Sequence, residues 1–275
     1  MKHSLLTFAF ALALSLFATL QVLCGQIAAA HQLSSPRVGV VRYPDGGVYL
    51  LYGLPGNYVL GPRMLDGADA ASFSERCGIV ARKGSLALLG PDLSLVGTFE
   101  AGERAPLLGI DSDPATAIAW LPTAQKLVHW NGQSFASVSV PDLSQEGEVS
   151  FVSKRDSQTA SLLLHSPSGS VSEASVSLQT GQILSVATTA GVQGSSFRYR
   201  SFVIFSNGRD VVIATPSDGN TRRFPLGTDD LKIERASSDC LHISSPTTRR
   251  NWLLHFRNND IDLAELPPSP VEVTK

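Results

Sequence analysis

The chain has 275 residues, with 22 lysines and arginines against 24 aspartates and glutamates, which gives a formal net charge of −2 at pH 7. This balance, without an arginine-rich stripe or interleaved aromatic residues, argues against nucleic acid or an anionic membrane surface as a partner. Three cysteines are too few for the cysteine-dense pattern of a small disulfide scaffold. The length fits one large domain or two small ones.

Residues 1–30 have the layout of a secretory signal peptide. Lys2 gives a positive start, residues 4–23 are apolar apart from small hydroxylated side chains and Gln21, and three alanines end at Ala30. We therefore expect cleavage after Ala30 and a secreted or periplasmic protein. The apolar run is also long enough for one membrane span, so an uncleaved anchor is the alternative, and no other span is expected. A lipid anchor at Cys24 is disfavoured because Leu23 before it is too large for the usual site.

Residues 31–275 are predicted to form a single all-β domain. Short apolar or alternating runs recur along them, separated by Gly, Pro, Asp, Asn and Ser, as in a sandwich, barrel or propeller. The only helical turn that the pattern allows lies around residues 63–71.

The predicted strands fall into groups of four. The first two groups are residues 72–75, 77–81, 85–89 and 93–97, and residues 107–110, 117–120, 126–130 and 134–138. The third and fourth are residues 149–152, 160–164, 171–176 and 182–186, and residues 196–199, 202–205, 210–214 and 221–224. The fifth is residues 231–234, 240–243, 251–256 and 261–266.

In nearly every group the second strand is the most apolar, which is typical of a strand covered on both faces. The turns at residues 43–46, 166–169 and 206–209 contain glycine, which tolerates the positive φ of tight hairpins. Before the first group, residues 38–42, 48–52 and 58–60 supply only three strands. A fourth is expected from residues 271–274, within a tail (268–275) that would close a ring, or from the stretch near Gln32 and Leu33.

The groups begin about 35 to 47 residues apart, which is the length of a propeller blade. In this rhythm the chain resembles the β-propeller superfamily, in the general manner of WD-repeat or bacterial six-bladed periplasmic propellers. The Gly-His and Trp-Asp signatures of true WD repeats are missing, so the resemblance implies the fold and no functional residues. A β-sandwich or two small β-domains are the alternatives.

Histidine is the main candidate for chemistry. After cleavage, His31 would be the first residue, and its amine and imidazole could chelate copper together with a second histidine, as in secreted copper oxygenases. The possible second ligands are His129, His165, His242 and His255, of which the first and last lie on third strands and the other two on second strands. No two have local ligand spacing, so we expect ordinary, partly buried side chains and no metal or cofactor.

Other polar groups have structural explanations. The acidic turns at residues 111–113, 228–230 and 258–262 offer too few oxygens for calcium and suit Asx turns. The arginine pairs at 222–223 and 249–250 suit solvated strand edges. Cys77 and Cys240 lie in non-adjacent blades of the predicted ring, beyond the Cα separation of about 7 Å that a disulfide permits.

The sequence has no nucleophile elbow and no phosphate loop. This favours an exported, non-catalytic binding or scaffolding module that docks a protein or glycan on its propeller loops. The alternative is a propeller-fold lyase or hydrolase with a site of histidines and acids at the channel mouth. Two or more of the four internal histidines, with acids, within about 5 Å at one mouth would favour the enzyme.

Overall fold

The computed structural model describes residues 36–103, 105–215, 219–257 and 260–269. The chain divides into two units, residues 1–36 and residues 37–275. The signal segment, His31, the stretch near Gln32 and residues 271–274 all lie outside the described residues. None of the helices in the described ranges is long and apolar enough to cross a membrane.

The described residues form six antiparallel sheets, in which neighbouring strands are consecutive in the chain. The first three sheets contain β1 (Arg37–Arg42), β2 (Val48–Leu54) and β3 (Asn57–Leu65); β4 (Ala70–Phe73), β5 (Gly78–Arg82), β6 (Ser85–Leu89) and β7 (Leu95–Glu100); and β8 (Leu107–Gly109), β9 (Ile118–Leu121), β10 (Lys126–Trp130) and β11 (Phe135–Ser139). The other three contain β12 (Glu148–Lys154), β13 (Thr159–His165), β14 (Ser170–Ser177) and β15 (Ile183–Gln193); β16 (Ser196–Tyr199), β17 (Phe202–Asn207), β18 (Asp210–Ala214) and β19 (Thr221–Pro225); and β20 (Lys232–Arg235), β21 (Cys240–Ser244), β22 (Asn251–Arg257) and β23 (Asp260–Glu265).

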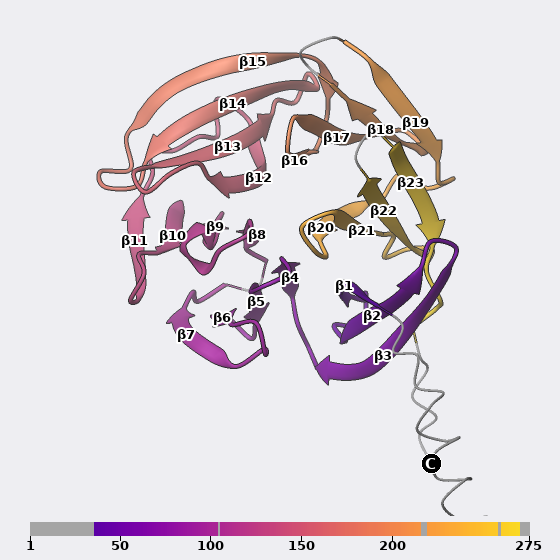
Figure 1. Cartoon of the computed structure of the whole chain (residues 1–275). Coiled ribbons are helices and arrows are strands. Elements are labelled where there is room, and N and C mark those ends of the chain that lie inside the picture. Colours follow the sequence, from indigo (N-terminus) through magenta and orange to yellow (C-terminus); the bar gives the residue numbers. More distant parts are fainter. Residues whose placement is uncertain (1–35, 104, 216–218, 258–259, 270–275) are drawn as a thin grey trace, which may run out of the picture. The chain divides into compact units, whose positions relative to one another are not determined.

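The sheets follow one another around a common centre in chain order, as Figure 1 shows. The first strands of the four-stranded sheets lie innermost, with β8 packed between β4 and β12, β12 against β16, and β20 against β4. The predicted grouping into five sets of four strands and one set of three is confirmed. The fold is the six-bladed β-propeller that the sequence rhythm indicates.

The three-stranded sheet differs from the others in its position. The Val40 amide donates to the Ala236 carbonyl at 2.9 Å, and Arg42 contacts Glu234 at 2.9 Å. Residue numbers rise along β1 while they fall along the segment that it faces, so β1 runs antiparallel to β20. In the other sheets, the second strand runs antiparallel to the innermost first strand. β1 therefore has the direction of a second strand. No described residue occupies the innermost position of this sheet.

In four of the five four-stranded sheets the second strand is the most deeply buried, as predicted, whereas in the sheet of β16 to β19 the third strand, β18, is more buried than β17. All four residues of β9 and all five of β21 are buried. The predicted hairpin glycines also hold their positions: Gly46, Gly169 and Gly208 have φ angles of 78°, 88° and 64°. These angles lie in the left-handed region that glycine enters without steric cost.

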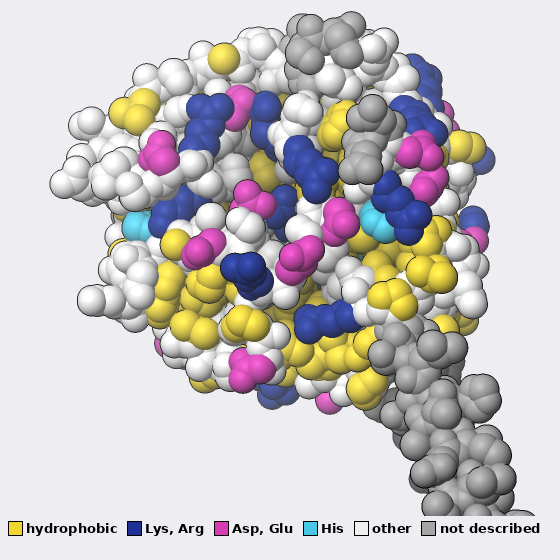
Figure 2. Space-filling view, in the orientation of Figure 1, with side chains coloured by type: hydrophobic (Ala, Val, Ile, Leu, Met, Phe, Trp, Pro, Cys, Tyr) yellow, Lys and Arg dark blue, Asp and Glu magenta, His cyan; other side chains and the backbone are white. Residues whose placement is uncertain are grey.

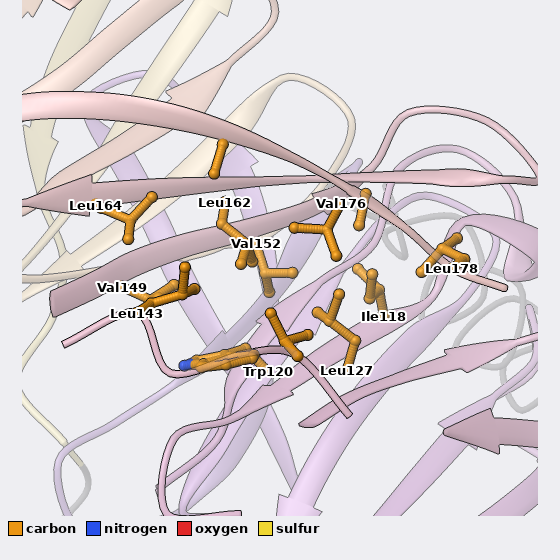
Figure 3. Packing of buried hydrophobic residues seen from close by; sticks show 13 residues of the cluster. Ile118, Trp120, Leu127, Leu143, Val149, Val152, Leu162, Leu164, Val176 and Leu178 are labelled. Carbon is orange, nitrogen blue, oxygen red and sulfur yellow. The ribbon is translucent and has the colours of Figure 1, made fainter. Parts of the chain in front are cut away.

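Apolar side chains fill the space between adjacent sheets. Figure 3 shows one such layer, where Trp120 and Leu127 from β9 and β10 meet Val152 and Leu162 from β12 and β13. Trp120 is 1 % exposed and the other three are fully enclosed. Burying a side chain of this size stabilises the fold by about 1.5–3 kcal/mol, so these layers hold neighbouring blades together. The two thiols belong to separate layers: Cys77 and Cys240 are both buried and free.

The helical turn predicted around residues 63–71 is wrong. Strand β3 continues to Leu65, with Arg63 opposite Tyr49, and β4 begins at Ala70. Irregularities in the β2–β3 pairing near Tyr49 shift the alternation of apolar residues, which explains the misleading pattern. The one helix among the described residues is a 3₁₀ turn, Pro114–Thr116, capped by Asp113, which accepts a hydrogen bond from the Ala115 amide at 2.7 Å.

Candidate functional site

Two pockets lie at the centre of the ring, at opposite ends of the innermost strands. One, of about 200 Å³, is lined by the later residues of β8, β12, β16 and β20; the other, of about 270 Å³, is lined by their earlier residues. Phe151 and Phe197 border both pockets, and their ring centroids lie 4.6 Å apart. The two rings therefore form an apolar floor between the pockets.

The first pocket is basic. Its walls carry four cationic side chains, Lys154, Arg198, Arg200 and Arg235, against one acidic side chain, Asp111. We call it the basic pocket. Charged side chains also gather around the centre of the ring on the face shown in Figure 2.

The position of each cation follows from the strand to which it belongs. Lys154 and Arg235 are the last residues of β12 and β20, Arg198 lies within β16, and Arg200 follows that strand. Because the innermost strands are parallel to one another, their ends meet at one side of the ring.

Arg200 adopts an unfavourable backbone conformation. Its φ is 54°, in the two-residue turn between β16 and β17. Such turns favour Gly or Asn, and the left-handed region costs another residue about 1–2 kcal/mol. Strained residues of this kind cluster at functional sites, and here the strained residue carries one of the four charges.

Tyr199 orders two of the arginines. Arg200 and Arg235 lie over its ring at 5.2 and 5.0 Å from the centroid, and the Tyr199 hydroxyl donates to the Ser238 carbonyl. Burial raises the pKa of Tyr199 to about 12, so its hydroxyl stays protonated. Arg235 also donates from Nη1 to the Ile110 carbonyl at 3.0 Å and pairs with Asp111. These contacts use one nitrogen of the guanidinium group, which leaves the other two without a hydrogen bond to a described residue.

Lys154 and Arg198 are anchored on the other side of the pocket. Lys154 Nζ donates to the carbonyls of Ala115 and Trp130 at 2.7 and 2.8 Å, and burial lowers its pKa. Arg198 Nη2 lies 2.6 Å from Glu173, and its Nε is buried without a partner among the described residues. Lys154 and Arg198 are thus fixed in place, and each keeps N–H groups that can donate to a further acceptor.

The second pocket has a different character. Its charged walls are dominated by the buried pair of Arg42 and Glu234, joined at 2.9 Å with 7 % and 15 % of their side chains exposed. Most of its other walls are apolar or small. Since the two charges neutralise each other, this end has no comparable excess of either sign.

The structure does not gather the candidate histidines at either central pocket. His129 and His165 lie in different sheets, on β10 and β13, while His242 and His255 share a sheet, on β21 and β22. His165 lies 3.6 Å from Glu148 and His255 lies 3.7 Å from Asp239. None of the four borders the basic pocket or the second pocket. Within the described ranges, no three His, Cys, Asp or Glu side chains are grouped to hold a metal ion.

The acidic turns stabilise the backbone and carry structural contacts. Asp230 accepts hydrogen bonds from the Thr228 and Ser245 hydroxyls and from the Thr247 amide at 2.5 to 2.6 Å, and these contacts lower its pKa. Asp260 pairs with Arg222 at 3.1 Å, and Arg250 pairs with Glu265 at 2.8 Å. Both arginines are exposed, as the sequence predicts, with Arg222 on the outer strand β19 and Arg250 directly before β22.

None of the four cations of the basic pocket was predicted from the sequence. A usable signal exists: each lies in, or within two residues of, the first predicted strand of its group. No local spacing links them, because they come from three different sheets.

Comparisons with known proteins yield no match to a family model or to a curated protein. Among solved structures, Hsv2 of Kluyveromyces marxianus is 11 % identical and aligns over 80 % of each chain with a TM-score of 0.39. Hsv2 of Kluyveromyces lactis is 12 % identical over 80 % of this chain and 79 % of that one, also with a TM-score of 0.39. PorZ, a bacterial surface component of the type-IX secretion system of Porphyromonas gingivalis, is 9 % identical over 86 % of this chain and 38 % of its own, with a TM-score of 0.48. No residue role is transferred at this similarity, and the strand order alone establishes the fold.

Proposed function

We propose that this protein is an exported, non-catalytic binding module that holds an anionic group of its protein or glycan ligand in the basic pocket. The observation that carries the proposal is the set of four cationic side chains around a pocket of about 200 Å³ with a single acidic side chain among them. A rigid β scaffold with a loop-bordered central site is a common way to present binding groups.

The electrostatics of the pocket favour an anion. Charged walls in a concave site focus the field and raise the local concentration of ions of opposite charge. Hydrogen bonds from a guanidinium group to a carboxylate or phosphate are about twice as strong as neutral ones. The donors that remain on Arg235 and Arg198 supply such bonds.

Export rests on the layout of residues 1–30, and the expected consequence is a mature protein that begins at His31. Amino-terminal sequencing of the protein recovered outside the cytoplasm tests this. A protein that starts at Met1 and stays with the membrane would show an uncleaved anchor instead.

The binding function has a direct test. Arg200→Gly removes one charge and suits the left-handed turn, so we expect the variant to fold at least as stably as the wild type. Citrate, sulfate and phosphate should raise the melting temperature of the wild type above that in sodium chloride of equal ionic strength, since a ligand of the folded state stabilises it. The increase should be smaller in Arg200→Gly.

Arg223→Ser is the matched control, because Arg223 is an exposed arginine on the outer strand β19. It should respond to the anions like the wild type. If no anion stabilises the wild type, or if Arg200→Gly responds as strongly as the wild type, the proposal is wrong.

A further inference from the structure

The basic pocket combines charged walls with an apolar floor. Leu108, Ile110, Phe151, Val152 and Phe197 line its inner part. Phe151 and Phe197 are 8 % and 9 % exposed, and Ile110 is 6 % exposed. An inorganic anion would meet the cations but leave this apolar surface uncovered.

The pocket is also small. Its volume of about 200 Å³ lies below the range of about 300–1,000 Å³ that encloses drug-sized ligands. A group the size of a single amino-acid residue therefore matches it better than a chain of sugars or a nucleotide.

We propose that the ligand is a carboxylate that adjoins an apolar group, so that the carboxylate meets the arginines while the apolar group covers the phenylalanine floor. This inference rests on the proposed function and specifies its ligand. Planar guanidinium groups match the two oxygens of a carboxylate in a bidentate geometry. Two of the arginines, Arg200 and Arg235, are already oriented by their contacts with the Tyr199 ring.

Two sources supply this chemistry: the carboxyl terminus of a polypeptide that ends in an apolar residue, and a free branched-chain organic acid. N-acetylleucine and 4-methylpentanoate share the carboxylate and the isobutyl group, but only the first has the amide of a peptide chain. Preferential binding of N-acetylleucine indicates a polypeptide end, and equal binding indicates a free acid. Both outcomes support a ligand in which a carboxylate adjoins an apolar group.

The experiment is a calorimetric titration of the mature protein with N-acetylleucine, N-acetylleucinamide, 4-methylpentanoate, acetate and sulfate. For a ligand of this size we expect a Kd of about 2 mM for N-acetylleucine. Acetate lacks the apolar group and the amide lacks the charge, so each should bind at least about tenfold more weakly.

Substitutions test the apolar floor and the cationic walls of the basic pocket separately. Leu108→Asn should weaken N-acetylleucine binding and leave sulfate binding unchanged, whereas Arg200→Gly should weaken both. Leu184→Asn, at a leucine on β15 that is 59 % exposed, is the matched control and should change neither.

The possible failures are distinguishable. If sulfate or acetate binds as tightly as N-acetylleucine, the apolar floor contributes nothing and this inference is overturned, while the proposed anion-binding function stands. If none of the anions binds, both are overturned.

Discussion

His242 is a histidine that the core keeps neutral. Its Nε2 lies 3.1 Å from Asn251 Oδ1, and the Asn251 amide group donates to the Arg249 carbonyl at 3.2 Å, so the histidine donates from Nε2. Its Nδ1 is buried and has no partner among the described residues. Burial, followed by the charge of Arg42, lowers the pKa of His242 to about 3.

This shift predicts a loss of stability in mild acid. The folded pKa lies below the ordinary value, so between about pH 6.5 and pH 3 the unfolded chain takes up a proton that the folded chain does not. The free energy of unfolding therefore falls as pH falls through this range. Between pH 6.5 and pH 4.5, His242→Gln should lose about 2 kcal/mol less than the wild type in urea denaturation.

Ser244→Ala serves as the control, because Ser244 is buried on the same strand β21 and carries no titratable group. Its unfolding free energy should follow the wild-type pH dependence. An identical pH dependence in the wild type and in His242→Gln would contradict the assignment.

The residues of the basic pocket show what a single sequence conceals. Lys154 and Arg235 are 81 positions apart, and nothing near either one distinguishes it from an ordinary charged residue at the end of a strand. They line one pocket because two strand ends meet at one side of the ring. The histidines are the opposite case: their residue type suggested chemistry, but they lie in three different sheets and none of them borders either central pocket.

Among the strands, β15 has an unusual outer edge. It is the longest described strand, with 11 residues, and it contains no charged residue. Four of the other five outer strands, β3, β7, β19 and β23, carry at least one charge, and β11 has only five residues. Charges on edge strands prevent pairing with other sheets, and Leu184 and Val186 on β15 are 59 % and 44 % exposed.

This edge predicts concentration-dependent self-association through β15. Val186→Lys places a charge on the edge, so in sedimentation velocity the variant should remain monomeric at concentrations where the wild type associates. An exposed substitution of this kind should change the unfolding free energy by no more than about 0.5 kcal/mol.

Val96→Lys is closely matched, because Val96 is also 44 % exposed and lies on the outer strand β7, which already carries Glu100. It should associate like the wild type. A wild type that stays monomeric at every concentration would contradict the prediction.

The strands themselves were predictable because hydrophobic alternation and glycine turns are local signals. Second strands such as β9 and β17 were identified by continuous apolar residues. The pattern failed around β3, where the register with β2 is irregular. It also could not show that β1 holds a second-strand position, because that depends on contacts with Glu234 and Ala236 almost 200 residues away.

At the scale of the whole molecule, those contacts join the two ends of the ring. Glu234 meets Arg42, and one of its oxygens also accepts a hydrogen bond from the Ala71 amide at 3.3 Å. Glu234→Gln would leave the buried Arg42 without its counter-charge, and we expect a loss of about 3 kcal/mol in the free energy of unfolding. Urea denaturation at neutral pH measures this loss.

Glu265→Gln is the control, because Glu265 pairs with Arg250 within one sheet and both side chains are about half exposed. Breaking an exposed pair should cost no more than about 1 kcal/mol. If the two variants lose the same stability, the Arg42–Glu234 pair does not contribute to closing the ring.

The junction between Arg42 and Glu234 also sets an order of events during synthesis. The two residues are 192 positions apart, and a ribosome adds about 5–20 residues per second, so β1 waits roughly 10–40 s for its partner. Throughout that interval the nascent chain carries a strand whose inner edge and buried arginine have nothing to pair with. The first sheet to be synthesised is therefore among the last to be completed. A chaperone that binds the nascent chain would have to shield the unpaired edge of β1 near the amino terminus for the longest time.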